Sequence, residues 1–236
     1  LEFRRVLFRS GAKTPKSYSQ GHCFKCFKTK AECDLCIMKP ETCHYHLGTC
    51  RENQFAHDVC FQPHIVYLAN SSALKIGITR IVNMPTRWLD QGATQALPIL
   101  KVGSRRLSGH LETMFGTQIA DKTDWRKLLK GEAEPLNLVE QRDQIIEEFA
   151  PKIQSIRDEF SQNLEFNEGL EFLENETPRE FIYPVEQYPE KIKSLNLDKT
   201  PKIRGVLQGI KGQYLLLDIG VINIRKYTGY ELILRA

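Results

Sequence analysis

The sequence lacks most of the features that assign a chain to a specialised class of protein. None of its 236 residues belongs to an apolar run approaching the roughly 18 residues of a membrane-spanning helix, and no apolar signal segment follows its start. It has no internal repeat, no low-complexity tract and, after Cys60, no cysteine. These absences exclude collagenous, fully disordered and disulfide-stapled classes, and they predict a cytoplasmic protein with no membrane partner. The composition, 41% hydrophobic and 26% charged, is that of an ordinary globular chain with one or two domains.

An initiator methionine is also missing. The opening LEFRRVLFRS reads as the in-frame translation of a common short-read sequencing adapter. We therefore expect residues 1–10 to be an artefact outside the fold, as in a metagenomic fragment, and natural N-terminal residues to be absent.

The net charge of the whole chain is only +4, but the net charges of its separate segments are large and opposite in sign. Residues 63–130 carry ten basic and four acidic side chains, residues 131–200 carry seven and seventeen, and residues 201–236 carry six and two. Basic segments on either side of an acidic one suggest that a polyanion such as nucleic acid binds part of the surface. The alternative is that the acidic segment folds back and neutralises the basic ones within the chain.

The patterns along the chain predict an α+β fold. After the artefact, its parts are a cysteine-rich zinc-binding head (11–62), a three-stranded sheet with flanking helices (63–130), an acidic helical segment and linker (131–200), and a small C-terminal antiparallel β sheet of hairpins or a half-barrel (201–236).

Within residues 63–130, the β-type runs HIVYLA and ALKIGITR flank the turn signal Asn70-Ser71-Ser72 and predict a hairpin. PTRWLDQGA predicts a helix that opens at Pro85 and ends near Gly92. ALPILKVG predicts the third strand and SGHLETMFGTQIA the second helix. In the acidic segment, apolar residues at three- or four-residue spacing predict a helix over 136–175, which Pro151 kinks or divides.

All seven cysteines lie between Cys23 and Cys60. Two donors separated by two residues can bind one tetrahedral zinc ion from a tight turn, and thiolates suit that ion. Together with one histidine, the cysteines supply the eight donors of two closed structural sites: Cys23, Cys26, Cys33, Cys36, Cys43, His46, Cys50 and Cys60. The spacing favours an interleaved arrangement, in which the first pair shares an ion with Cys43 and His46, and the second pair with Cys50 and Cys60.

Three alternatives to this arrangement stay open at the level of sequence. His44 competes with His46 for the histidine position. A single four-cysteine site would leave spare thiols. Disulfides or free thiols would bind no metal, although disulfides require an oxidising compartment.

A second group of candidate residues follows Pro63. IVYLA is followed by LKIGITR, then by Arg87 on the next expected helix and Glu112 on the one after. This order resembles the core of the GIY-YIG endonuclease family. The resemblance implies that Tyr67 and Gly77 match its two tripeptides, that Arg87 contacts the scissile phosphate, and that Glu112 holds one magnesium ion.

Lys75 stands where that family has its second tyrosine, which weakens the case for catalysis more than the case for binding. In an active enzyme, Tyr67 would be the base or a positioning group for phosphodiester hydrolysis, beside Arg87 and the magnesium on Glu112. Each residue also has an ordinary interpretation: Tyr67 as a half-buried aromatic, Arg87 as an arginine paired with an acid, and Glu112 as a solvated carboxylate.

Further basic residues are candidates for binding nucleic acid: Arg80, Arg105, Arg106 and Lys211. In GIKGQYL, backbone N–H groups beside Lys211 could meet a phosphate, although a plain hairpin with a positive φ at Gly212 is the simpler interpretation. Basic and aromatic residues alternate just afterwards, which is typical of contact with single strands: Arg225, Lys226, Tyr227 and Tyr230.

Most of the chain, residues 20–236, also resembles one uncharacterised bacterial family known only as a domain of unknown function. The resemblance rests on the cysteine-rich head, LKIGITR with PTRWLDQGA, the ADKTDWRKLL stretch and GIKGQYL, and it implies no activity. Three functions therefore stay open: a zinc-stabilised nucleic-acid-binding protein with a nuclease-like core of doubtful catalytic competence, an active magnesium-dependent endonuclease acting on DNA or RNA, and a zinc-scaffolded adaptor for a protein partner.

Overall fold

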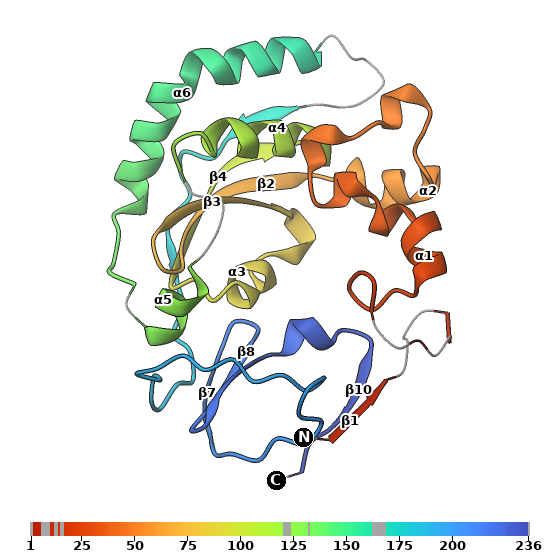
Figure 1. The fold of residues 1–236 in the computed structure, drawn as a ribbon. Coiled ribbons are helices and arrows are strands. Elements are labelled where there is room, and N and C mark those ends of the chain that lie inside the picture. The colour runs from red at the N-terminus through yellow and green to blue at the C-terminus, as the bar shows by residue number, and fades with distance from the viewer. Residues whose placement is uncertain are drawn as a thin grey trace.

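The fold is described from a computed structural model. The described residues are 2–5, 10–11, 14, 17–119, 124–131, 133–161 and 169–235. They form a mixed helical and antiparallel-sheet structure, as the sequence predicts, with a small separate sheet near the C-terminus (Figure 1). Among them, no helix combines the length and the apolar composition that crossing a membrane demands.

The central sheet begins with the predicted hairpin of β2 (His64–Asn70) and β3 (Leu74–Arg80). Strand β4 (Gln95–Val102) pairs with β2 on its other side, also as predicted. The prediction of three strands is wrong, because β5 (Leu170–Phe172) and β6 (Arg179–Glu180) both pair with β4. These short strands of the acidic segment cover an edge whose backbone groups would otherwise need another partner.

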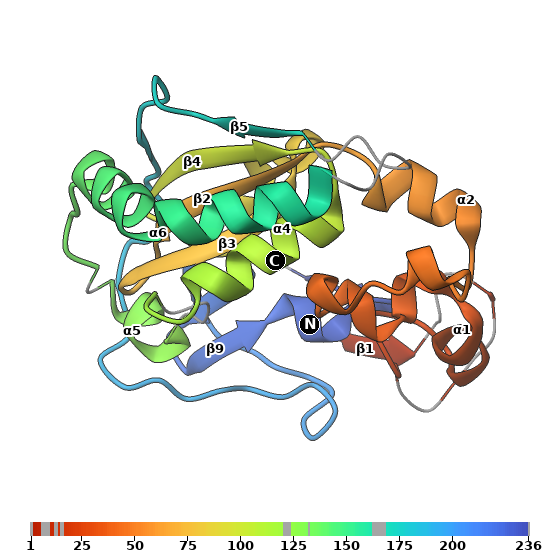
Figure 2. The ribbon, with the colours of Figure 1, turned by 90° about the horizontal axis from the view of Figure 1, so that it is seen from above.

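One face of this sheet packs against α4 (Arg105–Phe115) and α6 (Leu138–Ser161). Figure 2 shows both helices on the same side of the strands. Ser104 caps α4, because its hydroxyl accepts a hydrogen bond from the N–H of Leu107 at 3.1 Å. The apolar side chains of alternate sheet residues, such as Val66 and Leu68, are fully buried beneath these helices.

Helix α6 contains Pro151 and changes direction along its length (Figure 1), so the predicted kink is confirmed. The predicted extent of helix over 136–175 is wrong at its end. Residues 162–168 lie outside the described residues, and the chain is already strand at Leu170–Phe172. A three-residue strand is too short to show a period of its own in the sequence.

The opposite face of the sheet is covered by α3 (Thr86–Asp90). The helix ends near Gly92, as predicted, and this glycine takes the left-handed conformation with φ +70°. Trp88 of α3 is fully buried against the sheet beside Tyr67. This second, smaller core faces the C-terminal sheet and positions the residues of the candidate site.

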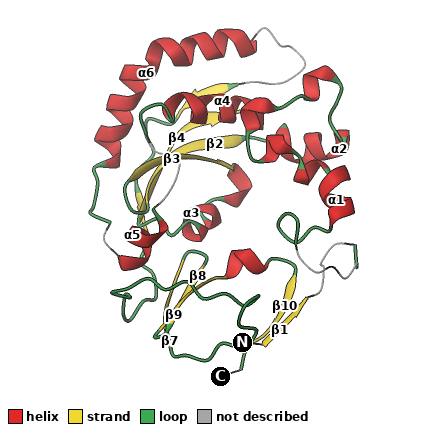
Figure 3. Cartoon of the chain, viewed as in Figure 1, coloured by secondary structure: helices red, strands yellow, loops and turns green. Residues whose placement is uncertain are grey.

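The described residues of the cysteine-rich head form mainly short helices and turns (Figure 3), including α1 (Phe24–Thr29) and α2 (Asn53–Phe55). A turn at Pro40–Thr42 packs directly on α4 at Gly109, where a Cβ atom would lie 2.6 Å from the backbone nitrogen of Glu41. Arg105 of α4 donates a hydrogen bond to the carbonyl oxygen of Ile37 at 2.6 Å. The head is therefore fixed to the core through α4.

The C-terminal region forms a three-stranded antiparallel sheet of β7 (Leu207–Lys211), β8 (Tyr214–Leu217) and β9 (Gly220–Asn223). The predicted small antiparallel sheet is thus confirmed. Helix α5 (Trp125–Lys130) packs on it with Leu128 and Leu129, which joins it to the rest of the molecule. Residues 120–123 of the ADKTDWRKLL stretch lie outside the described residues.

A separate pair of strands joins the two ends of the chain. β1 (Glu2–Arg5) pairs antiparallel with β10 (Tyr230–Ile233). Strand β1 falls within the residues expected to be an artefact, while residues 6–9 lie outside the described residues. The assignment of residues 1–10 as an adapter translation stays a prediction.

Candidate functional site

The register of the central hairpin places the predicted residues on one face of the sheet. Tyr67 lies directly opposite Gly77, and Ala69 lies opposite Lys75. Because opposed residues of antiparallel strands project to the same side, Tyr67, Gly77 and Lys75 share the face that α3 covers. A Cβ atom at position 77 would lie 2.7 Å from both Cζ and Oη of Tyr67, so the glycine makes room for the phenol.

Tyr67 is fully buried. Its hydroxyl donates a hydrogen bond to Oε1 of Gln91 at 2.9 Å, and its ring meets that of Trp88 edge-on, with centroids 5.8 Å apart. The pKa of Tyr67 is raised to about 12, chiefly by burial. Arg87, which hydrogen-bonds to the phenol, lowers this pKa, and the carboxylate of Glu112 raises it. Arg87 therefore lies beside Tyr67, whereas Glu112 belongs to α4, which packs on the other face of the sheet, and its carboxylate acts on the tyrosine only through its charge.

This environment does not suit Tyr67 to the role of a general base. Its hydroxyl proton is engaged by Gln91, and a pKa of about 12 leaves almost no phenolate at neutral pH. Lys75, at the position where the resembled family has a second tyrosine, is buried too and only 5% exposed. Tyr67 and Lys75 thus lie beneath the surface on which a ligand would bind.

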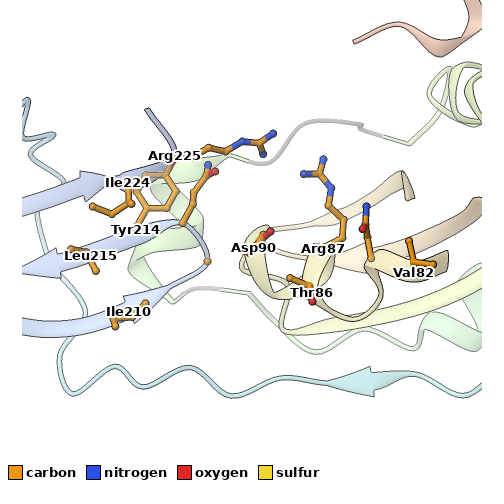
Figure 4. Close-up of a pocket in the computed structure, with 12 residues that line it drawn as sticks. Val82, Thr86, Arg87, Asp90, Ile210, Tyr214, Leu215, Ile224 and Arg225 are labelled. Atoms are coloured by element: carbon orange, nitrogen blue, oxygen red, sulfur yellow. The ribbon is translucent and has the colours of Figure 1, made fainter. Parts of the chain in front are cut away.

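Arg87 reaches a large cleft between α3 and the C-terminal sheet. The cleft has a volume of about 730 Å³, and Asp90, Gln213, Tyr214 and Arg225 also line it. We call it the arginine cleft, because Arg87 and Arg225 extend into it from opposite walls (Figure 4). No ion pair among the described residues engages either guanidinium group.

Two further pockets adjoin the arginine cleft and share Arg87, Gln213 and Arg225 with it. The first, also about 730 Å³, adds Asn223 and Lys226. The second, about 140 Å³, adds Gln91 and the indole of Trp125. Arg87 therefore lies between the buried tyrosine and adjoining hollows whose lining contains the basic residues Arg87, Arg225 and Lys226 and the acidic residues Asp90 and Asp198.

Gly212 positions the far wall of the arginine cleft. It lies in the turn between β7 and β8 with φ +57°, which confirms the plain hairpin anticipated from GIKGQYL. A Cβ atom there would lie 2.8 Å from the carbonyl oxygen of Asp90 and 2.9 Å from the nitrogen of Gly92. The turn thus touches the end of α3 backbone to backbone, and this contact sets the distance between the two walls.

Two buried polar atoms beside the cleft lack partners. Neither Oε1 of Gln213 nor Oδ1 of Asn223 has a hydrogen bond among the described residues. An unpaired buried acceptor costs about 1–3 kcal/mol, so both atoms are available to a donor on a ligand. Their side chains border the same hollow as Arg87 and Arg225.

The other basic candidates lie elsewhere. The structure contradicts an exposed phosphate contact by Lys211, which is 1% exposed and has its ammonium nitrogen 5.1 Å from the ring centroid of Tyr188 and 5.7 Å from that of Tyr183. Burial lowers the pKa of this lysine. Arg105 is engaged in fixing the head, and Arg106 lies over the ring of Phe160 at 5.1 Å.

Arg80, at the end of β3, lies opposite His64 and does not line the arginine cleft. Sequence reasoning missed Gln91, which lines the smaller adjoining pocket, because a single amide in a turn carries no distinctive pattern. It did notice Arg225 through its alternation with aromatic residues. Trp125 and Tyr214 were not recognised as neighbours, since 88 residues separate them in the sequence.

The head provides the donors for a metal. None of the seven cysteines, all of which lie in the described part of the chain, belongs to a disulfide. Cys36, Cys43, Cys50 and Cys60 line one small cavity, and oxygen or nitrogen donors of Asp34 and His44 lie within 4.8 Å of the sulfur of Cys36 and of one another. Burial raises the pKa of Cys36 to about 12 and that of Cys60 to about 11, with further contributions from the neighbouring thiols.

The remaining predicted metal ligands do not join that cavity. His46 is exposed, whereas its competitor His44 lies beside Cys36. Cys23 and Cys26 form a separate pair, in which hydrogen bonding from the backbone of Cys26 lowers the pKa of Cys23 to about 7. Cys33 does not line the cavity either.

The fold and these two features define an α+β protein with a cysteine-rich head, a potential metal site and a cleft that contains two arginines. The chain belongs to the family described as "Protein of unknown function (DUF2797)", whose match spans residues 3–232. No curated protein and no solved structure matches the chain.

Proposed function

We propose that this protein binds single-stranded nucleic acid in the arginine cleft, and that the nuclease-like core supports this surface instead of cutting the bound strand. The observation that carries the proposal is that Arg87 and Arg225, neither of which has an ion pair among the described residues, lie on opposite walls of one large hollow (Figure 4). Arginine binds phosphate oxygens through two parallel hydrogen bonds, so a phosphodiester backbone between the walls would satisfy both side chains.

Aromatic side chains at one end of the cleft favour a single strand. Trp125 and Tyr214 are nearly parallel, at 7°, with ring centroids 6.3 Å apart. Both rings line the small pocket that contains Arg87 and Arg225. Unpaired bases stack on such surfaces whatever their sequence, whereas the bases of a duplex are already stacked on each other.

The unpaired amide oxygens support the same ligand. Oε1 of Gln213 and Oδ1 of Asn223 can accept hydrogen bonds from exocyclic amino groups of bases or from a ribose hydroxyl. The cleft therefore offers cations for the phosphates, rings for the bases and acceptors for polar edges.

The experiment is a binding panel on the full chain with labelled single-stranded DNA, single-stranded RNA and duplex DNA of matched sequence. We expect single strands to bind more tightly than the duplex, and Arg87→Ala and Arg225→Ala each to weaken binding by about tenfold. Arg157→Ala is the matched control, because Arg157 is exposed on α6, which covers the other face of the sheet. Equal affinities of all four proteins, or no binding, would refute the proposal.

A magnesium-dependent endonuclease is the second candidate, favoured by the position of Arg87 beside Tyr67 and by the effect of the Glu112 carboxylate on the pKa of that tyrosine. It predicts cleavage of the bound strand that requires magnesium and is lost in Glu112→Gln. Binding without cleavage over the same panel would exclude it. If nucleic acid does not bind at all, the remaining candidate is a scaffold for a protein partner.

A further inference from the structure

We infer that the head binds one zinc ion through the thiolates of Cys36, Cys43, Cys50 and Cys60. The inference concerns a different part of the molecule from the arginine cleft and does not depend on nucleic-acid binding. It replaces the two interleaved sites expected from spacing with a single closed site.

Cys36, Cys43, Cys50 and Cys60 all line one small cavity, whose volume is about 20 Å³. A single water-sized sphere needs about 10–15 Å³, so the space suits one small particle and no larger ligand. Zinc in structural sites takes four ligands in a tetrahedron, and four cysteines line this cavity. The donor atoms that lie within 4.8 Å of one another are those of Asp34, Cys36 and His44, so the other three thiolates would have to move closer on binding the ion.

Separate short elements bring these cysteines to one place. Cys36 lies in the turn Leu35–Ile37, Cys43 follows the turn Pro40–Thr42, and Cys60 ends the helical segment Ala56–Cys60. Cys50 lies in the intervening loop. These elements have little apolar core of their own, since Ala31 and Ala56 are the small buried apolar residues near the cavity. A bound ion would supply the cross-links that packing does not.

The two nearby non-sulfur donors already have partners. Oδ2 of Asp34 accepts a hydrogen bond from Nε of Arg51 at 2.6 Å. Nδ1 of His44 lies 2.7 Å from the hydroxyl of Thr49, and its Nε2 lies 3.5 Å from Oδ1 of Asp34. Because thiolates are softer ligands and four are present, we assign the ion to the cysteines and assign Asp34 and His44 to the surrounding hydrogen-bond network.

The other three cysteines fall outside this set. Cys23 accepts a hydrogen bond from the hydroxyl of Ser10 at 3.6 Å and interacts with Cys26. Neither these two nor Cys33 lines the cavity. These three thiols should therefore react with a thiol reagent whether or not the ion is bound, and they serve as controls for the four cysteines that line the cavity.

The test counts zinc and reactive thiols in the purified full chain. We expect about one zinc ion per chain by elemental analysis, with three thiols reacting rapidly with a thiol reagent and all seven reacting after chelation. Two zinc ions per chain, or seven reactive thiols before chelation, would overturn the inference.

Variants identify the ligands independently of the count. Cys50→Ser and Cys60→Ser should lose the ion, whereas Cys23→Ser should keep it, and His44→Gln should weaken zinc binding by no more than about 10–100-fold. Cobalt substitution provides a second readout on the wild-type protein, because four thiolates around cobalt give intense sulfur-to-metal absorption. Loss of zinc in His44→Gln with retention in Cys60→Ser would assign the ion to Asp34, Cys36 and His44 instead.

Discussion

At the scale of single residues, the site depends on the packing of the large side chain of Tyr67 against Gly77, which has no side chain. Tyr67 occupies the space that any Cβ atom at Gly77 would fill. The sequence predicted that Tyr67, Gly77, Arg87 and Glu112 belong together, and the hairpin register explains how the first two meet. The sequence could not predict that Tyr67 would be fully buried. The alternation of residues along a strand predicts which face of the sheet a side chain lies on, but not how thick the layer is that covers that face.

Removal of the phenol therefore tests whether Tyr67 acts on a ligand. In Tyr67→Phe, the hydrogen bond to Gln91 is lost, which should lower the free energy of unfolding by about 1 kcal/mol. Because the hydroxyl does not reach the surface, the affinity for a single strand should stay within about twofold. Denaturant unfolding and a binding titration on the same preparation check both parts. A tenfold loss of affinity with unchanged stability would contradict this account.

His64 makes stability depend on pH. Burial lowers its pKa to about 4, from an ordinary value of about 6.5. The unfolded chain therefore takes up the proton first as the pH falls. The contribution of His64 to the free energy of unfolding is therefore complete above about pH 6.5. As the pH falls to about 4, this contribution is lost progressively, and the loss amounts to as much as roughly 3 kcal/mol.

Urea unfolding of the wild-type chain and of His64→Asn across this pH range measures the effect. The variant, although less stable at neutral pH, should lose less stability on acidification. His57→Asn is the control, since His57 is exposed. Parallel pH profiles for the wild-type protein and His64→Asn would show that another group is responsible.

At the scale of elements, close backbone contacts at glycines hold three separate parts in position. The head meets α4 at Gly109, and the C-terminal hairpin meets the end of α3 at Gly212. The sequence predicted the individual helices and hairpins well, because periodicity and turn residues are local signals. It did not predict β5 and β6, since their pairing with β4 depends on a return of the chain that no local pattern encodes.

Alanine at position 109 should detach the head. Alanine is a better helix former than glycine by about 1 kcal/mol, yet its Cβ would lie 2.6 Å from the Glu41 nitrogen and from Cβ of Pro40. We expect Gly109→Ala to be destabilised by about 1–3 kcal/mol and its head to be cleaved faster by protease. Thr113→Ala, at an exposed site on the same helix, should have neither effect. Slower cleavage of Gly109→Ala would mean that the head is not seated there.

Alanine at position 212 should disturb the arginine cleft. Residues other than glycine pay about 1–2 kcal/mol for a left-handed conformation, and the added methyl would also meet Asp90. Gly48→Ala is a matched control, because Gly48 has φ +69° but an added Cβ atom there would have no neighbour within 4 Å among the described residues. Gly212→Ala should lose more stability than this control and bind single strands more weakly. Equal effects of both variants would show that the contact with α3 is unimportant.

At the scale of the whole molecule, the two interpretations of the charge pattern both apply in part. The acidic segment does neutralise some basic residues, since Glu171 of β5 pairs with Lys101 of β4 at 3.0 Å. Arg87 and Arg225 are left out of such pairs among the described residues. The sequence predicted a basic core and a basic tail, but their meeting in one cleft is a tertiary contact that no local pattern could supply.

The most direct test of the account is the salt dependence of single-strand binding. If Arg87 and Arg225 each neutralise one phosphate, the slope of log affinity against log salt should become shallower by about 0.7 for each arginine removed, and by about 1.4 in the double alanine variant. The slope of Arg157→Ala should stay close to that of the wild-type chain. A double variant with the wild-type affinity and slope would contradict the claim that the arginine cleft is the binding site.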